Sequence, residues 1–116
     1  MTRILVCGGR DYNDHAAITR TLSHFDPLTS ILIEGGAPGA DTHAADHASD
    51  EEWVAVECFP ARWSLHGKAA GPIRNQQMID EGRPDLVIAF PGGRGTADMI
   101  RRAHAAGIPV QTGGAT

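Results

Sequence analysis

The residues best suited to bind an anion form the stretch Pro91, Gly92, Gly93, Arg94, Gly95 and Thr96. Its three glycines allow a charged group to approach the main chain closely, and Arg94 adds a positive charge. Thr96 is expected to cap a helix whose free N–H groups and dipole favour phosphate or carboxylate. The alternative is a tight strand-to-helix turn that binds nothing. One glycine would serve such a turn, so three favour a binding loop.

Two other glycine-rich stretches have a related composition. They are Cys7-Gly-Gly-Arg-Asp11 and Glu34-Gly-Gly-Ala-Pro-Gly-Ala-Asp41. Asp11 and Asp41 could bind ribose hydroxyls, but each is also a good turn or cap residue. From these two stretches we predict as ligand contacts Gly8, Gly9, Arg10, Gly35, Gly36 and Asp41.

A fourth candidate region is the segment 60–71, which reads as a loop long enough to be a lid or a binding segment. Trp63 could stack on a base, or it could pack down on its own domain. His66 and Lys68 could reach a phosphate, or they could belong to a solvated loop. Beyond the loop, Pro72 is expected to open a helix. The region adds Lys68, Arg74 and Asn75 to the predicted contacts.

Alternating apolar runs and helical stripes position these loops. Strands are expected at 3–7, 30–34, 53–59, 86–90 and 108–111, and helices follow the first four, with a frayed tail from Gln111 to Thr116. This alternation predicts one α/β domain over 1–116, a Rossmann-like three-layer fold with a five-stranded parallel sheet in the order 3-2-1-4-5. In that order strands one and four are neighbours where the winding reverses, which brings the loops after Cys7 and Phe90 together.

Composition narrows the function. Of the residues, 41% are hydrophobic and 21% are charged, and the net charge is −4, which argues against a non-specific nucleic-acid binder. We expect no membrane span, no signal peptide and a cytoplasmic protein. Nine of the ten basic residues are arginine. The planar guanidinium group of arginine binds phosphate or carboxylate through two hydrogen bonds at once, which lysine cannot do. Arg10, Arg62, Arg74 and Arg94 fall in or beside the loops, whereas Arg20, Arg83, Arg101 and Arg102 suit a solvated surface.

Other chemistries fit the sequence less well. Neither a GxGxxG pattern nor a Walker loop is present, so we expect no NAD-dependent dehydrogenase, no P-loop ATPase and no resident cofactor. Cys7 and Cys58 are expected in strands roughly 9.6 Å apart, too far for a disulfide, and both read as buried. His43 and His47 have a metal-ligand spacing, but no glutamate stands between them as in HExxH, and we expect no metal.

The stretch Pro91–Thr96 resembles the PGGxGTxxE signature of the SLOG superfamily, which includes LOG-type phosphoribohydrolases of nucleoside monophosphates and DNA-processing protein A. The stretches 7–11, 34–41 and 67–75 are similar to its small YspA-like branch, whose function is unknown. The resemblance implies the fold and a nucleotide-like ligand, and relatives commonly pair as homodimers. In the LOG pattern a glutamate and an upstream arginine cleave the N-glycosidic bond. Here Met99 holds the glutamate position, and Arg74 matches the arginine.

Two hypotheses follow. The first is a binding module for a nucleotide or a nucleotide-derived phosphate ligand, acting as sensor, carrier or sequestering agent. The second is a LOG-like phosphoribohydrolase, in which Arg74 and Asp98 would be the catalytic residues. Asp98 precedes Met99 by one residue, which rotates it about 100° around the helix, and it could equally serve as a favourable charge in the first helical turn. A protein- or nucleic-acid-interaction domain is the third class.

Overall fold

The computed structural model describes residues 1–114, and residues 115 and 116 lie outside the described part. A parallel five-stranded sheet forms its middle layer, in the order β3-β2-β1-β4-β5. This confirms the predicted strand order and the Rossmann-like α/β class. The strands are β1 (Thr2–Cys7), β2 (Ser30–Glu34), β3 (Ala55–Cys58), β4 (Leu86–Ala89) and β5 (Val110–Thr112).

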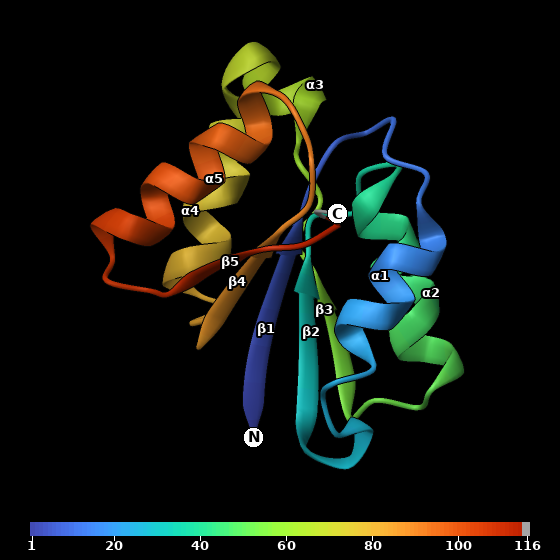
Figure 1. The fold of residues 1–116 in the computed structure, drawn as a ribbon. Coiled ribbons are helices and arrows are strands. Elements are labelled where there is room, and N and C mark those ends of the chain that lie inside the picture. Colours follow the sequence, from blue (N-terminus) through green and yellow to red (C-terminus); the bar gives the residue numbers. More distant parts are fainter. Residues whose placement is uncertain (115–116) are drawn as a thin grey trace.

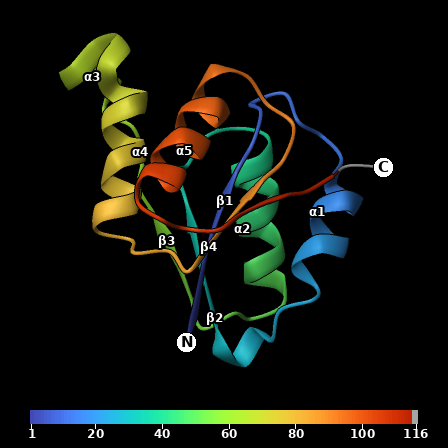
Figure 2. The same cartoon turned by 60° about the vertical axis from the view of Figure 1, so that its left-hand side comes forward.

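Helices cover both faces of the sheet, as Figure 1 shows and the turned view in Figure 2 confirms. One face carries α1 (His15–Leu22) and α2 (Ala40–Asp50). The other carries α4 (Ala70–Asp80) and α5 (Arg94–Ala105), with the short α3 (Trp63–His66) beyond the carboxyl ends of the strands. No helix among residues 1–114 is long and apolar enough to cross a membrane.

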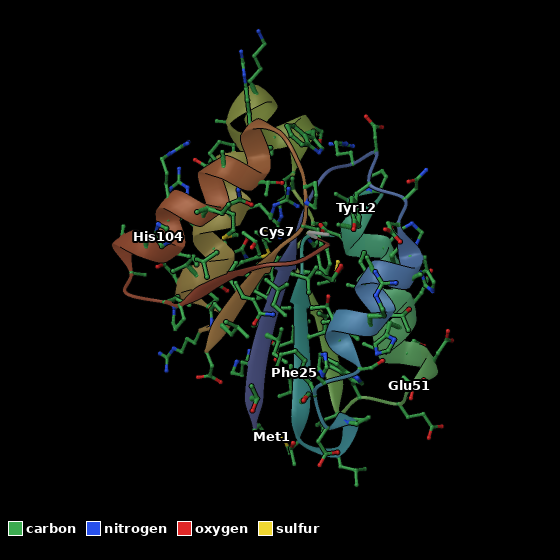
Figure 3. All side chains as sticks on the ribbon, viewed as in Figure 1. Met1, Cys7, Tyr12, Phe25, Glu51 and His104 are labelled. Carbon is green, nitrogen blue, oxygen red and sulfur yellow. The ribbon has the colours of Figure 1, made fainter. Side chains whose placement is uncertain are left out.

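The apolar side chains of β1, β2 and β4 alternate between two cores, one under each helical layer. Figure 3 draws the side chains on both faces of the sheet. On the α1/α2 side, alanines at positions 40, 44 and 48 give α2 a small face that lies close on the sheet. On the α4/α5 side, Met78 and Met99 pack on Leu5 and Val87. Burial of both faces explains why β1, β2 and β4 are continuous apolar runs. The packing fixes where each strand ends, and thereby where the loops meet.

Several expectations about element boundaries were wrong. The segment 60–71 is not an extended loop, because it holds α3 and a 3-10 turn, Gly67–Ala69. Helix α4 starts at Ala70, so Pro72 lies within the first turn, where its missing N–H costs no helical hydrogen bond. Helix α5 starts at Arg94 with Gly93 as N-cap, so Thr96 is a buried residue of the first turn and not the cap.

The end of the chain is more ordered than expected over the residues that the structure describes. Strand β5 extends to Thr112, and the N–H of Gly113 donates to the carbonyl of Ala89 at 2.9 Å. Of the predicted frayed tail, residues 115 and 116 lie outside the described residues.

Candidate functional site

A cavity of about 940 Å³ opens at the carboxyl ends of β1 and β4, where the winding of the sheet reverses. This is the position at which ligands bind in open parallel sheets. Its walls come from the β1–α1 loop, the β4–α5 loop, the start of α2, and the segment from α3 through α4. Of the predicted contacts, those that line it are Gly8, Gly9, Arg10, Asp41, Lys68, Arg74, Asn75, Pro91, Gly92, Gly93, Arg94, Gly95 and Thr96.

The two loops that flank the switch point touch directly, as the strand order predicts. The N–H of Gly9 donates to the carbonyl of Pro91 at 2.8 Å. The carbonyl of Gly9 in turn accepts from the N–H groups of Tyr12 at 3.1 Å and Ala40 at 3.2 Å. The first N–H of α2 is therefore satisfied by the protein itself, and the β1–α1 loop is held from both sides.

The amino end of α5 is different. Its first helical hydrogen bond runs from the N–H of Ala97 to the carbonyl of Gly93, at 3.0 Å. Among residues 1–114, no protein acceptor meets the N–H groups of residues 93–96. All four residues line the cavity. Free N–H groups at the positive end of a helix dipole form a binding site for an anion.

The glycines around the cavity fall into two groups. A Cβ on Gly8 would lie 2.6 Å from the Cβ of Ala40, and a Cβ on Gly92 would collide with the side chain of Thr96, so tight packing accounts for both glycines. A Cβ on Gly93 or Gly95 would meet nothing within 4 Å, and neither residue has a positive φ. Contacts with the described chain therefore do not explain these two glycines.

The β2–α2 loop is built around its own hydrogen bonds, and Gly35 and Gly36 do not line the cavity. The carboxylate of Asp41 accepts from the N–H groups of Gly35 at 3.1 Å and Ala37 at 3.2 Å, while that of Glu34 accepts from Gly36. Burial raises the pKa of Asp41 to about 6, against the lowering effect of these N–H groups. Asp41 thus holds the turn of this loop from the first turn of α2, whose N-cap is Gly39, and it also lines the cavity.

Arg74 bridges this loop to the cavity wall. Its Nη1 atom donates to the carbonyl of Gly35 at 2.5 Å, and its Nε atom donates to Oδ1 of Asn75 at 3.1 Å. The space that a Cβ on Gly35 would need is filled by this guanidinium group. Gly35 therefore leaves the space that the guanidinium group of Arg74 occupies.

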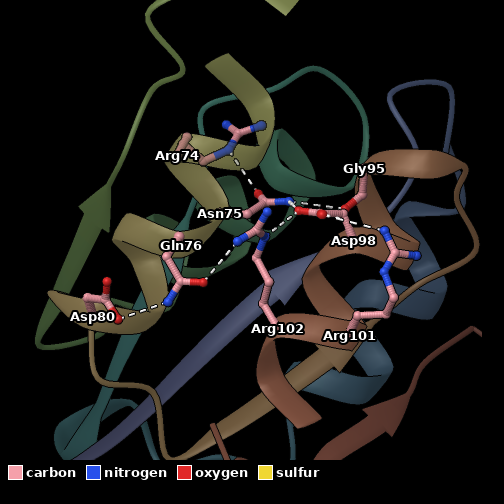
Figure 4. Close-up of polar contacts among 8 residues, drawn as sticks. All are labelled: Arg74, Asn75, Gln76, Asp80, Gly95, Asp98, Arg101 and Arg102. Atoms are coloured by element: carbon pink, nitrogen blue, oxygen red, sulfur yellow. Dashed lines mark hydrogen bonds and ion pairs between the residues drawn. The ribbon is translucent and has the colours of Figure 1, made fainter. Parts of the chain in front are cut away.

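Asn75 links α4 to the amino end of α5 (Figure 4). Its buried amide donates to the carbonyl of Gly95 at 3.2 Å and to Oδ2 of Asp98 at 3.0 Å. Asp98 also accepts from Nε of Arg102 at 2.8 Å and forms an ion pair with Arg101. Although burial of Asp98 acts to raise its pKa, the hydrogen bonds from Arg102 and Asn75 outweigh that effect and lower it. Asp98 is therefore held as a carboxylate.

Asp98 lines the cavity, whereas Met99 is fully buried in the core on the α4/α5 side. The rotation of about 100° between adjacent helical residues places the carboxylate on the cavity side and the thioether on the sheet side. Two arginines assigned to the solvated surface also belong here, because Arg101 lines the cavity and Arg102 fixes Asp98. Their spacing of three and four residues from Asp98 was the signal for these contacts.

Several positively charged side chains line the cavity without a partner in the described part of the protein. Within residues 1–114, the side chains of Arg10, Lys68 and Arg94 form no hydrogen bond or ion pair, and they come from three separate segments. Asp11 and Trp63 also line the cavity, and Trp63 is 48% exposed, whereas Arg62 and His66 are not part of its wall. The surplus of positive charge favours an anionic ligand.

The cysteines offer no nucleophile. Both are free, and burial raises the pKa of Cys7 to about 12. Cys58 is exposed, contrary to expectation, since β3 is an edge strand. Partial desolvation of its sulfur and the neighbouring Glu34 carboxylate raise the pKa of Cys58 to about 11. Thiolate is the nucleophilic form, so neither residue is activated.

The chain is similar to one protein family and to a phage protein. A family model described as "YspA, cpYpsA-related SLOG family" matches residues 2–66, which include the β1–α1 and β2–α2 loops. The chain is also similar to the Gene 61 protein of Mycobacterium phage D29. The two are 37% identical over 123 residues, which cover 95% of this chain and 94% of the phage protein. No solved structure matches the chain.

Proposed function

Because the chain belongs to the YspA, cpYpsA-related SLOG family, a membership that suggests a nucleotide-related role, we propose that it binds a nucleotide or nucleotide-derived phosphate ligand. The ligand would lie in the cavity at the carboxyl ends of β1 and β4. A phosphate group would sit against the N–H groups at the start of α5. The protein would act as a sensor, carrier or sequestering module.

The pair Gly93 and Gly95 carries this proposal. Gly95 lies in the first turn of α5, and glycine in a helix costs up to about 1 kcal/mol relative to alanine. Neither packing nor a positive φ requires glycine at these positions. A ligand that approaches the backbone closely would require it, because a Cβ on either residue would project into open space beside the free N–H groups.

The unpaired cations support the same ligand. Of the three acidic groups that line the cavity, Asp41 and Asp98 have protein donors, and Asp11 is the third. The side chains of Arg10, Lys68 and Arg94 have no such partners among the described residues. Phosphate contacts from these groups would weaken in salt, since exposed charges are screened over about 8 Å at physiological ionic strength.

The test is a panel of nucleoside mono-, di- and triphosphates, NAD and ADP-ribose, measured by thermal shift and by native mass spectrometry. We expect at least one compound to raise the melting temperature of the wild type and to stabilise Gly93→Ala or Arg94→Ala less. Arg20→Ala is the matched control, because Arg20 is an exposed arginine on α1 outside the cavity. If no compound stabilises the wild type more than Gly93→Ala, the proposal fails.

A second candidate function is hydrolysis of the N-glycosidic bond of a nucleoside 5′-monophosphate. The observation that favours it is the Asp98 carboxylate, which faces the cavity and is linked through Asn75 to Arg74. Its lowered pKa suits stabilisation of positive charge on a sugar ring and does not suit proton donation. We rank this function second because Asp41, the cavity carboxyl group with a raised pKa, is held by the N–H groups of Gly35 and Ala37 in its own loop.

Chromatography of AMP-type substrates separates the two functions. Released base that disappears in Asp98→Asn would establish the hydrolase. Binding without turnover would leave the binding module, and turnover that survives both Asp98→Asn and Arg74→Ala would exclude this mechanism.

We also propose a homodimer formed through α3 and α4. Leu65 is 66% exposed and Ile73 is 45% exposed, and a shallow groove beside Ile73 carries Asp80, Glu81 and Arg102. Opposite charges in one groove allow a second copy to pair with it in a two-fold arrangement. Light scattering should give twice the monomer mass, and Ile73→Glu should halve it. Leu28→Glu, at a residue that is 78% exposed on the opposite end of the sheet, should not.

A further inference from the structure

Two histidines meet across the contact between α1 and α2. His15 is the first residue of α1, and His43 lies in the first turn of α2. Their Nδ1 atoms are 3.1 Å apart, and the rings are edge-on with centroids separated by 5.1 Å. Neither residue lines the cavity at the carboxyl ends of β1 and β4. The pair is therefore separate from the proposed nucleotide site.

The sequence pattern had suggested a different pair. His43 and His47 are one turn apart on α2, but His47 is buried and packs edge-on against Trp53, with centroids 6.2 Å apart. The tertiary fold thus replaces His47 by His15 as the neighbour of His43. Among residues 1–114, no group of three or more histidine, cysteine or acidic side chains is arranged to hold a metal. Any metal at the His15–His43 pair would have two protein ligands and complete its shell with water.

The separation of the two nitrogens fits a shared metal ion. Imidazole nitrogens bind zinc and similar ions at about 2.1 Å. Two such ligands lie about 3.0 Å apart at a right angle and about 3.4 Å apart at the tetrahedral angle. The observed 3.1 Å falls between these limits. We propose that His15 and His43 form a binding site for a divalent cation that prefers imidazole ligands, such as Ni²⁺, Cu²⁺ or Zn²⁺.

The separation of the two nitrogens is already that of a bound pair, but their protons must be rearranged. In the hydrogen bond between the Nδ1 atoms one nitrogen accepts and the other carries the proton, so the donor ring must move its proton to Nε2 before both Nδ1 atoms can bind one ion. The pair is exposed, so an ion can reach it without opening the fold. Because each histidine belongs to a different helix, a bound ion would clamp α1 to α2. It would therefore stabilise the folded state by RT ln(1 + L/Kd), where L is the concentration of the free ion.

The test uses untagged protein and Ni²⁺ alone, with isothermal titration calorimetry and thermal unfolding as readouts. We expect one Ni²⁺ per chain and a rise in melting temperature on addition of the ion. His15→Ala and His43→Ala should each weaken binding by more than about tenfold and lose the rise. His104→Ala is the matched control, since His104 is an exposed histidine of α5 and should bind as the wild type does. Mg²⁺, which prefers oxygen ligands, should give no signal.

Both single variants change exposed or half-exposed side chains, and circular dichroism checks that they are folded before titration. If folded His15→Ala and His43→Ala bind Ni²⁺ as tightly as the wild type, the site lies elsewhere and the proposal is wrong. Absence of Ni²⁺ binding by the wild type overturns it as well. Neither outcome bears on the nucleotide site, whose test uses other residues.

Discussion

Replacement of Gly95 by alanine should make the protein more stable and a poorer binder. Gly95 is the second residue of α5, and a Cβ there would meet nothing within 4 Å. Alanine should therefore stabilise the helix by about 0.5–1 kcal/mol. For a chain of this length, that raises the melting temperature by about 3 °C. In the ligand complex, the new methyl group would stand where a phosphate approaches the free N–H groups, so we expect affinity to fall by about tenfold or more, which is about 1.4 kcal/mol.

The matched control is Ala97→Gly, two residues further along α5. Ala97 is exposed and does not line the cavity, so the change should cost up to about 1 kcal/mol of stability and leave affinity unchanged. The assays are urea unfolding for stability and calorimetry with the compound found in the nucleotide panel. Gly95→Ala should thus raise stability and lower affinity, whereas Ala97→Gly should lower stability and leave affinity unchanged. A Gly95→Ala protein that is destabilised, or that binds as tightly as the wild type, would refute the reasoning.

Three further changes test the structure around the cavity. Asn75→Ala removes the amide that joins α4 to Asp98, so urea unfolding should show a loss of about 1–3 kcal/mol. Because the pKa of Asp41 is raised from 3.8 to about 6 in the folded state, its contribution to the free energy of unfolding falls as pH rises through that range. In the wild type this fall should amount to up to about 3 kcal/mol between pH 4 and 7, and Asp41→Asn should remove it. Denaturant titrations of both proteins across this pH range measure the change. If the free energy of unfolding depends on pH in the same way in both proteins, the prediction is wrong. Gly39→Ala places a Cβ against the carbonyl of Gly9 at a φ of 80°, so thermal unfolding should show a loss of at least about 2 kcal/mol.

The strand order could be predicted because burial on both faces leaves a clear pattern. Runs such as Ile4-Leu-Val6 and Val87-Ile-Ala89 are apolar throughout, which is typical of parallel strands between two helical layers. The boundaries near the cavity were less predictable, since they depend on tertiary contacts. Pro72 suggested a helix start, but a proline is accepted anywhere in the first turn, and α4 begins two residues earlier.

The sequence predicts a glycine's place at the site correctly where the glycine exposes the backbone to the cavity. It does so less well where the glycine only makes room for a neighbouring side chain. The stretch 91–96 lines the cavity as expected, whereas Gly35 makes room for the guanidinium of Arg74. A sequence shows the same residue type in both cases, and only the neighbours tell them apart. The roles of Arg101 and Arg102 depended on the direction of Asp98, which the helical spacing alone could have indicated.

Both backbone polar groups of Gly9 are hydrogen-bonded to other segments of the protein, which limits how the cavity can change shape. The N–H and carbonyl of Gly9 tie the β1–α1 loop to the β4–α5 loop on one side and to α2 on the other, so this wall is fixed before any ligand arrives. Another part of the wall is the short segment that carries Trp63 and Lys68, both exposed. Compounds of different length should therefore share one anchored end and differ only in how far they displace that segment. Hydrogen exchange would then slow on ligand addition mainly in α3 and the turn after it, while the Gly9 amide would be protected from the outset.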